Sequence, residues 1–214
     1  MRCKMKFIVF EGLDGSGKSS LMAALERELQ KRAINFLRTR EPGGTPLGDE
    51  IRNMILRKEG PAPTPRTELL LYEASRSQHV DQVIRPALAA GTWVLCDRFS
   101  ASSVAFQSGG RAISEADVVM LNSFATGGLK ADVTVLLDLS VEESRRRRQG
   151  RGAVTGETED RIESEADTFH ENVRQSFLKQ SREDAASWIV LDARETPEVL
   201  FKQLLQSLTE RKVL

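Results

Sequence analysis

Short, almost wholly apolar runs recur along the chain and alternate with longer segments in which apolar residues return every three or four positions. Strands without a polar face belong in a parallel sheet that is covered on both sides. Alternation of such strands with helices predicts an α/β fold, a doubly wound parallel five-stranded sheet with helices on both faces. The predicted strands are residues 7–10, 34–37, 93–96, 133–137 and 187–191, and the predicted helices are residues 18–32, 67–90, 162–185 and about 199–208.

Two details of this pattern are specific enough to test. In the predicted 67–90 helix the expected buried face contains Leu70, Val80, Val83 and Ile84, and Gly91 follows in the position that commonly ends a helix. Residues 149–156 hold three glycines and show no apolar period. We therefore predict a mobile, irregular segment there.

Composition narrows the class of protein. A length of 214 residues favours one domain, residues 1–214, and a net charge of +0 argues against a protein that coats nucleic acid. The basic first residues lead into a short strand and glycines, not into a secretory or membrane-spanning segment, so we expect a cytoplasmic protein without membrane contact. Cys3 and Cys96 are too few for a disulfide framework, and Cys96 is expected to be a buried strand thiol.

The strongest chemical signal follows the first predicted strand. Residues 12–19 fit the phosphate-binding pattern G-x-x-x-x-G-K-[ST], the P-loop of P-loop NTPases. The glycines let successive backbone N–H groups point at phosphate oxygens, and the start of the next helix adds positive potential. Lys18 would reach the β- and γ-phosphates of ATP, and the Ser19 hydroxyl would bind Mg²⁺. The ATP-binding candidates are Gly12, Leu13, Asp14, Gly15, Ser16, Gly17, Lys18 and Ser19.

Two further segments contain candidate substrate contacts. Residues 39–45 (Thr-Arg-Glu-Pro-Gly-Gly-Thr) follow the second predicted strand, where open α/β sheets bind ligands, and Arg52 lies on the amphipathic segment that comes next. Tyr72 and Arg76 are four residues apart on a predicted helix and share one face. An aromatic ring beside a guanidinium can stack on a base and bond its edge, although such pairs are usually packing.

A third segment follows the third predicted strand. Asp97 ends that strand beside the phosphate-binding loop, where a carboxylate can order Mg²⁺ and its waters. Arg98 can bridge acceptor and donor phosphates with its two-pronged guanidinium. Ser103, Phe106 and Gln107 lie within about a turn of each other, so they could line one pocket.

Together these segments resemble the bacterial branch of the thymidylate kinase family. The resemblance runs from about residue 7 to the last helix and rests on residues 12–19, 39–44, 72–76, 97–99 and 160–163. It implies a Mg²⁺-dependent homodimer that moves the γ-phosphoryl group of ATP onto dTMP in dTTP synthesis.

The resemblance also implies roles for single residues. Asp14 falls on the position that binds the sugar 3′-hydroxyl, Tyr72 on that of a ring stacked on thymine, and the Glu41–Pro42 peptide is expected to be cis. Around the monophosphate it places Glu41, Arg52 and Arg98, and around the nucleoside Asp14, Tyr72, Arg76, Ser103, Phe106 and Gln107.

Two departures from the family pattern matter. Phe106 stands where Tyr is common, so selection against a 2′-hydroxyl is expected either to be weaker or to rest on bulk alone. Gly15 stands where the eukaryotic branch has Arg. A catalytic cation must then come from elsewhere in the chain. The arginine-rich segment of about 145–161 resembles the mobile LID of the bacterial branch. Arg148 or Arg151 is the candidate, although charge runs are usually solvated. The catalytic candidates are Lys18, Asp97, Arg98, Arg148 and Arg151. The metal candidates are Ser19 and Asp97, which would bind Mg²⁺ directly or through water.

Other functions remain open at this stage. A kinase for another pyrimidine nucleotide, such as dUMP or CMP, would share these motifs. A GTP-dependent switch protein would usually have an N-K-x-D-type segment after a late strand, which the sequence lacks. A non-catalytic nucleotide-binding module is disfavoured by intact Lys18 and Arg98, and His79 and His170 are expected to pack rather than bind metal.

Overall fold

A parallel five-stranded sheet forms the centre of the computed structural model, which describes residues 6–156 and 158–214. Its order, β2-β3-β1-β4-β5, and its parallel neighbours confirm the predicted doubly wound sheet. Cys96 is buried in the sheet as expected, and Cys3 lies outside the described residues. The strands are β1 (Phe7–Glu11), β2 (Phe36–Arg40), β3 (Trp93–Asp97), β4 (Val133–Asp138) and β5 (Trp188–Asp192).

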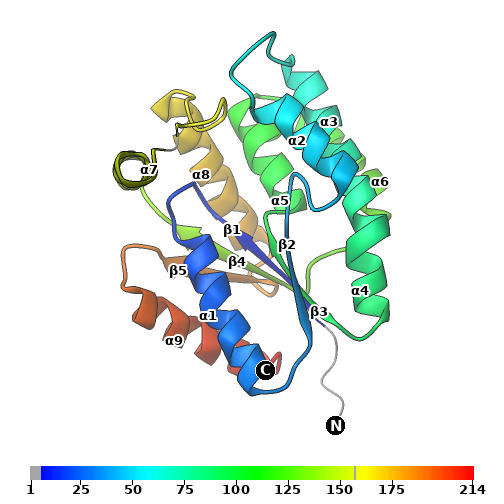
Figure 1. Cartoon of the computed structure of the whole chain (residues 1–214), viewed down its shortest axis with the longest axis vertical. Coiled ribbons are helices and arrows are strands. Elements are labelled where there is room, and N and C mark those ends of the chain that lie inside the picture. The colour runs from blue at the N-terminus through cyan, green and yellow to red at the C-terminus, as the bar shows by residue number, and fades with distance from the viewer. Residues whose placement is uncertain (1–5, 157) are drawn as a thin grey trace.

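Helices cover both faces of this sheet (Figure 1). Helices α1 and α9 share one face, while η1, α4 and α8 pack on the other. Across residues 6–156 and 158–214, no helix has the length and apolar content needed to cross a membrane. The helical segments are α1 (Lys18–Lys31), α2 (Pro46–Leu56), α3 (Pro65–His79), η1 (Val80–Ile84), α4 (Arg85–Ala89), α5 (Ser100–Ser103), η2 (Val104–Gly110), α6 (Glu115–Thr126), α7 (Val141–Thr155), α8 (Asp167–Glu183) and α9 (Pro197–Glu210), with η1 and η2 being π-helical.

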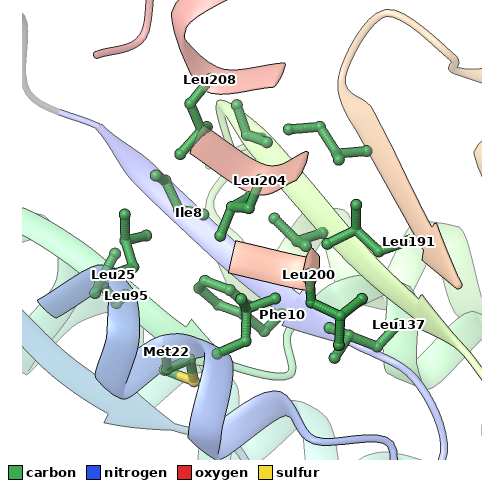
Figure 2. Close-up of a cluster of buried hydrophobic side chains, with 14 of the residues drawn as sticks. Ile8, Phe10, Met22, Leu25, Leu95, Leu137, Leu191, Leu200, Leu204 and Leu208 are labelled. Atoms are coloured by element: carbon green, nitrogen blue, oxygen red, sulfur yellow. The ribbon is translucent and has the colours of Figure 1, made fainter. Parts of the chain in front are cut away.

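Strand β1 illustrates why the apolar runs have no polar face. Successive side chains of a strand point to opposite faces. Ile8 and Phe10 therefore join the core beneath α1 and α9 (Figure 2), whereas Phe7 and Val9 pack against η1. Burial on both sides fixes the position of β1 in the sheet, and therefore also the position of the loop that follows at its carboxyl end.

Several element boundaries differ from the prediction. Strand β2 begins at Phe36 rather than residue 34, because Ile34 N–H donates to Leu29 O and closes the end of α1. Helix α8 begins at Asp167 rather than residue 162, because Asp160 Oδ1 accepts the N–H groups of Ile162 and Glu163 in a tight turn. Leu70 was expected in the core but is 55% exposed.

The segment 149–156, predicted to be irregular, is mostly helical. Residues 149–155 form the end of α7. Ser140 caps this helix by accepting from Glu143 N–H, and Glu143 pairs with Arg146 and Arg147 one turn on. Capping and i, i+3 or i, i+4 ion pairs thus support a helix that has no apolar period for sequence analysis to detect.

Candidate nucleotide-binding site

The loop between β1 and α1 adopts the conformation that the 12–19 motif predicts. Gly12, Gly15 and Gly17 have φ angles of +133°, +79° and +96°, which favour glycine. A Cβ atom at Gly12 would lie 2.5 Å from Leu137 O, so a larger residue does not fit there. Lys18 is buried and donates to Gly12 O and Leu13 O across the loop. This phosphate loop therefore combines a glycine turn, a helix start and a buried ammonium group.

A pocket lies beside the phosphate loop at the carboxyl ends of β1, β2 and β3, and we name it the Tyr72 pocket. Most of the predicted dTMP-binding residues line it, which the sequence spacing alone could not establish. Its lining is Asp14, Glu41, Pro42, Arg52, Leu56, Tyr72, Arg98, Ser102, Phe106, Gln107, Asp160 and Ile162. A larger cavity of about 650 Å³ between α5, α6 and α8 contains none of the predicted site residues, so we assign the chemistry to the Tyr72 pocket.

Arg98 joins this pocket to the phosphate loop. Its backbone is left-handed, with φ +69°, and its Nη2 donates to Asp14 Oδ1 at 2.9 Å. The guanidinium lies 4.9 Å from the centre of the Phe106 ring, a cation–π distance. Burial opposes ionisation of Asp14, but the charges of Arg98 and Lys18 outweigh it and hold the Asp14 pKa below its ordinary value. The arrangement thus keeps Arg98 charged and oriented between the phosphate loop and the Tyr72 pocket.

Glu11 is a site residue that sequence analysis did not single out. It is fully buried at the end of β1, where Oε1 accepts from Phe99 N–H and Oε2 accepts from the Ser102 hydroxyl at 2.7 Å. Its Oε2 lies 3.8 Å from Arg98 Nη1. Burial raises the Glu11 pKa to about 7, although Arg98 lowers it in part. The sequence feature that could have identified Glu11 is an acidic residue at the end of an apolar strand, directly before the phosphate loop.

This raised pKa predicts a pH-dependent stability. Between pH 4.5 and about 7 the folded chain retains a proton that the unfolded chain has lost, so stability decreases as pH rises through that window. The decrease amounts to about 3 kcal/mol by the linkage relation. Glu11→Gln is expected to remove this decrease, so urea unfolding at about pH 5 and about pH 8 should show a flatter profile for the variant. A variant with the same pH slope as the parent would contradict the assignment.

Glu41, which lines the pocket, forms a buried pair with Arg76, which does not. Glu41 Oε2 accepts from Arg76 Nε at 2.7 Å, and its Oε1 lies 2.9 Å from His79 Nδ1, so His79 packs as expected. Arg76 also donates to Glu73, Asn122 and Ser103. Neither Arg76 nor Ser103 lines the Tyr72 pocket, and their base contacts stay predictions. The Glu41–Pro42 peptide is cis, which confirms the expectation.

The candidate LID approaches the phosphate loop from α7 (Figure 1). Ser144 Oγ donates to Asp14 O at 2.7 Å, and Arg148 Nη1 donates to Ser144 Oγ. A Cβ atom at Gly15 would lie 3.2 Å from Arg147 Cβ and from Ser144 O, which explains why a side chain at position 15 does not suit this arrangement. Arg148 is 5% exposed beside the loop.

Arg151 has a different environment. It lies on the exposed side of the helix and pairs with Glu163 at 2.8 Å. The structure therefore gives different partners to two arginines that sequence analysis left equivalent. Arg148 donates to Ser144, which is bound to the phosphate loop, and Arg151 pairs with Glu163.

Two predicted metal candidates suit Mg²⁺. Asp97 Oδ1 is buried at the end of β3 and has no hydrogen-bond partner among the described residues, and Ser19 is exposed at the start of α1. Among the residues the structure describes, no group of three or more His, Cys, Asp or Glu side chains is placed to enclose a metal ion. Mg²⁺ keeps several waters and uses few protein ligands together with substrate phosphates, so a carboxylate and a hydroxyl beside a phosphate loop fit its needs.

Known proteins match this chain along most of its length. A protein-family model described as thymidylate kinase matches residues 10–204. The chain is 98% identical over 214 residues to a thymidylate kinase of Bdellovibrio bacteriovorus, with the whole of both chains covered. It is 44% identical to one of Trichlorobacter lovleyi, covering 89% of this chain and 91% of that one. It is 43% identical to one of Pseudomonas fluorescens, covering 94% and 93%.

Proposed function

This chain belongs to the thymidylate kinase family, and from that premise we propose how the site described above moves the γ-phosphoryl group of ATP onto dTMP. The activity is that of a dTMP kinase, an ATP-using transferase of nucleotide biosynthesis. The products are dTDP and ADP. Our proposal concerns the residues, the metal, the assembly and the compartment through which the chain performs this reaction.

One observation supports the proposal most directly. The Arg98–Asp14 pair, at 2.9 Å, belongs at once to the phosphate loop and to the lining of the Tyr72 pocket. A donor triphosphate in the loop and an acceptor monophosphate in the pocket would therefore meet at Arg98. Phosphoryl transfer depends mainly on such positioning and on neutralising charge over the transferring group.

The transfer step needs no strong base. An oxygen of the dTMP phosphate attacks the γ-phosphorus of ATP, and the bond to the bridging oxygen of ADP breaks as the new bond forms. Lys18 stabilises the β- and γ-oxygens, Arg98 holds the acceptor phosphate, and Arg148 covers the reacting group and excludes water. Ser19 and Asp97 would hold Mg²⁺, which when bound neutralises phosphate charge. These roles are assigned from the positions of the side chains around the loop.

The nucleoside would occupy the inner part of the Tyr72 pocket. Tyr72 offers a ring for stacking on the base, and Gln107 Oε1 is a buried acceptor with no protein partner in the described structure. Arg52, which donates to Pro42 O, lies on the same lining and adds positive charge. Phe106 packs with Phe169 and Phe177 and closes the sugar side by bulk, with no hydroxyl to bond.

A substrate panel tests this proposal. ADP formation is to be measured with ATP, Mg²⁺ and each of dTMP, dUMP, dCMP and dGMP in turn. We expect the highest kcat/KM with dTMP and a requirement for the divalent ion. A higher kcat/KM with dUMP or dCMP would favour a kinase for another pyrimidine nucleotide instead. If no dTDP forms, the proposal is rejected.

We also propose that the chain works as a homodimer in the cytoplasm. Helix α3 contacts both α2 and α6, and all three helices present exposed apolar side chains. Phe124 is 85% exposed and Met120 is 59% exposed on α6, and Leu70 is 55% exposed on α3. Covering such a face with a second copy accounts for apolar surface that a monomer would leave in water.

Phe124→Asp is therefore expected to shift sedimentation from dimer towards monomer. The matched control is Val154→Asp, which places the same charge on an apolar residue of α7 that is 87% exposed. The control should sediment like the parent. A Phe124→Asp variant that remains dimeric would rule out α6 as the interface.

A further inference from the structure

Glu68 lies on α3 behind the Tyr72 pocket and does not line it. Its carboxylate is 1% exposed and accepts hydrogen bonds from three side chains. Arg111 donates from Nε at 3.2 Å and from Nη2 at 3.1 Å, and Arg161 Nη2 donates at 2.6 Å. Gln107 Nε2 donates at 2.9 Å. A buried carboxylate thus connects one pocket residue to two arginines.

The two arginines keep Glu68 ionised. Burial alone would raise the Glu68 pKa, but hydrogen bonds from Arg111, Gln107 and Arg161 lower it below the ordinary value. An ionised carboxylate has no proton to donate. It can therefore only accept from the Gln107 amide, which must turn its NH₂ group towards Glu68.

This fixed orientation decides what Gln107 offers a ligand. A side-chain amide has one NH₂ group and one carbonyl oxygen, so orienting one end determines the other. With Nε2 bound to Glu68, the remaining polar atom is Oε1, which is buried and has no partner in the described part of the chain. Gln107 lines the Tyr72 pocket, so its unpaired Oε1 is an acceptor that a ligand there can use.

We propose that Glu68 is a positioning residue for base selection, which fixes the Gln107 amide so that the pocket accepts from a pyrimidine ring N–H. Thymine and uracil have such an N–H at ring position 3, whereas cytosine has an unprotonated nitrogen there. Cytosine would place two acceptors against each other and leave both unpaired, a mismatch that a polar site rejects strongly. This inference rests on the proposed function and explains how the same pocket separates thymine from cytosine.

The test compares dTMP with 5-methyl-dCMP, which keeps the 5-methyl group and changes only the 3 and 4 positions of the ring. The parent enzyme should favour dTMP in kcat/KM by at least ~10². In Glu68→Gln the neutral amide can donate as well as accept, so Gln107 can turn over. We expect the preference for dTMP to fall by about tenfold or more while KM for ATP stays unchanged.

Two further variants separate positioning from structural support. Glu68→Asp keeps the negative charge for Arg111 and Arg161, but its side chain is one methylene shorter and no longer reaches Gln107, so the preference for dTMP should also fall. If Glu68→Gln does not fold, the result with Glu68→Asp tests the proposal. The matched control is Glu165→Gln, which removes the second carboxylate paired with Arg111, at 2.7 Å, and leaves Glu68 against Gln107. Its preference for dTMP should match that of the parent.

The outcomes separate this inference from the proposed function. A parent enzyme that makes no dTDP would remove the proposed function itself. An active parent whose preference survives both Glu68 variants, or disappears equally in Glu165→Gln, would overturn the role of Glu68 alone. An active parent that does not distinguish dTMP from 5-methyl-dCMP would overturn it as well.

Discussion

Replacing Arg148 with alanine is expected to lower kcat by about 10²–10³, the usual effect of removing one preorganised charge from a reacting group. Arg148 is buried beside the phosphate loop and donates to Ser144 Oγ, which in turn donates to Asp14 O. Its guanidinium is therefore oriented before substrates arrive. Because Arg148 does not line the Tyr72 pocket, KM for dTMP should change much less than kcat. Steady-state kinetics with both substrates varied measures this.

The same arginine run provides the controls. Arg146 has a side chain that is 76% exposed and pairs only with Glu143 among the contacts the structure records for it, so Arg146→Ala should retain the parental rate. Arg151→Ala should have an intermediate or small effect, because Arg151 pairs with Glu163 on the exposed side. If Arg148→Ala turns over like Arg146→Ala, the catalytic cation lies elsewhere.

Much of the fold and the phosphate loop could be predicted because their signals are local. The glycine motif of residues 12–19 requires only a strand before it and a helix after it. Both can be recognised from the pattern of apolar residues. The parallel sheet follows from strands such as residues 133–137, which have no polar face. Helix α7 escaped prediction because ion pairs and a cap stabilise it instead of an apolar face.

The finer structure of the site depends on contacts between distant residues. Glu68 meets Gln107 and Arg161 across separations of 39 and 93 residues, and Glu11 meets Ser102 across 91. Nothing in the local pattern around Glu68 distinguishes it from an ordinary solvated residue of a helix. The predicted site residues were mostly ligand-facing ones, whereas the side chains that orient them became visible only once the fold brought them together.

A second large effect is expected for Lys18→Met, which keeps the length of the side chain and removes its charge. Lys18 Nζ is the buried cation of the phosphate loop, held by Gly12 O and Leu13 O. Without it the β- and γ-phosphates lose a direct charge contact, so kcat/KM for ATP should fall by about 10²–10³. Initial rates at varied ATP concentration measure the change.

The stability of the same variant separates function from structure. Burial and the nearby Arg98 charge lower the Lys18 pKa, so the folded chain keeps this ammonium at a desolvation cost that its pairing with Asp14 offsets only in part. Lys18→Met removes that cost, and its melting temperature should equal or exceed that of the parent. Such a result would mark Lys18 as retained for phosphate binding at the expense of stability. A variant that melts well below the parent and loses activity in proportion would instead make Lys18 a structural residue.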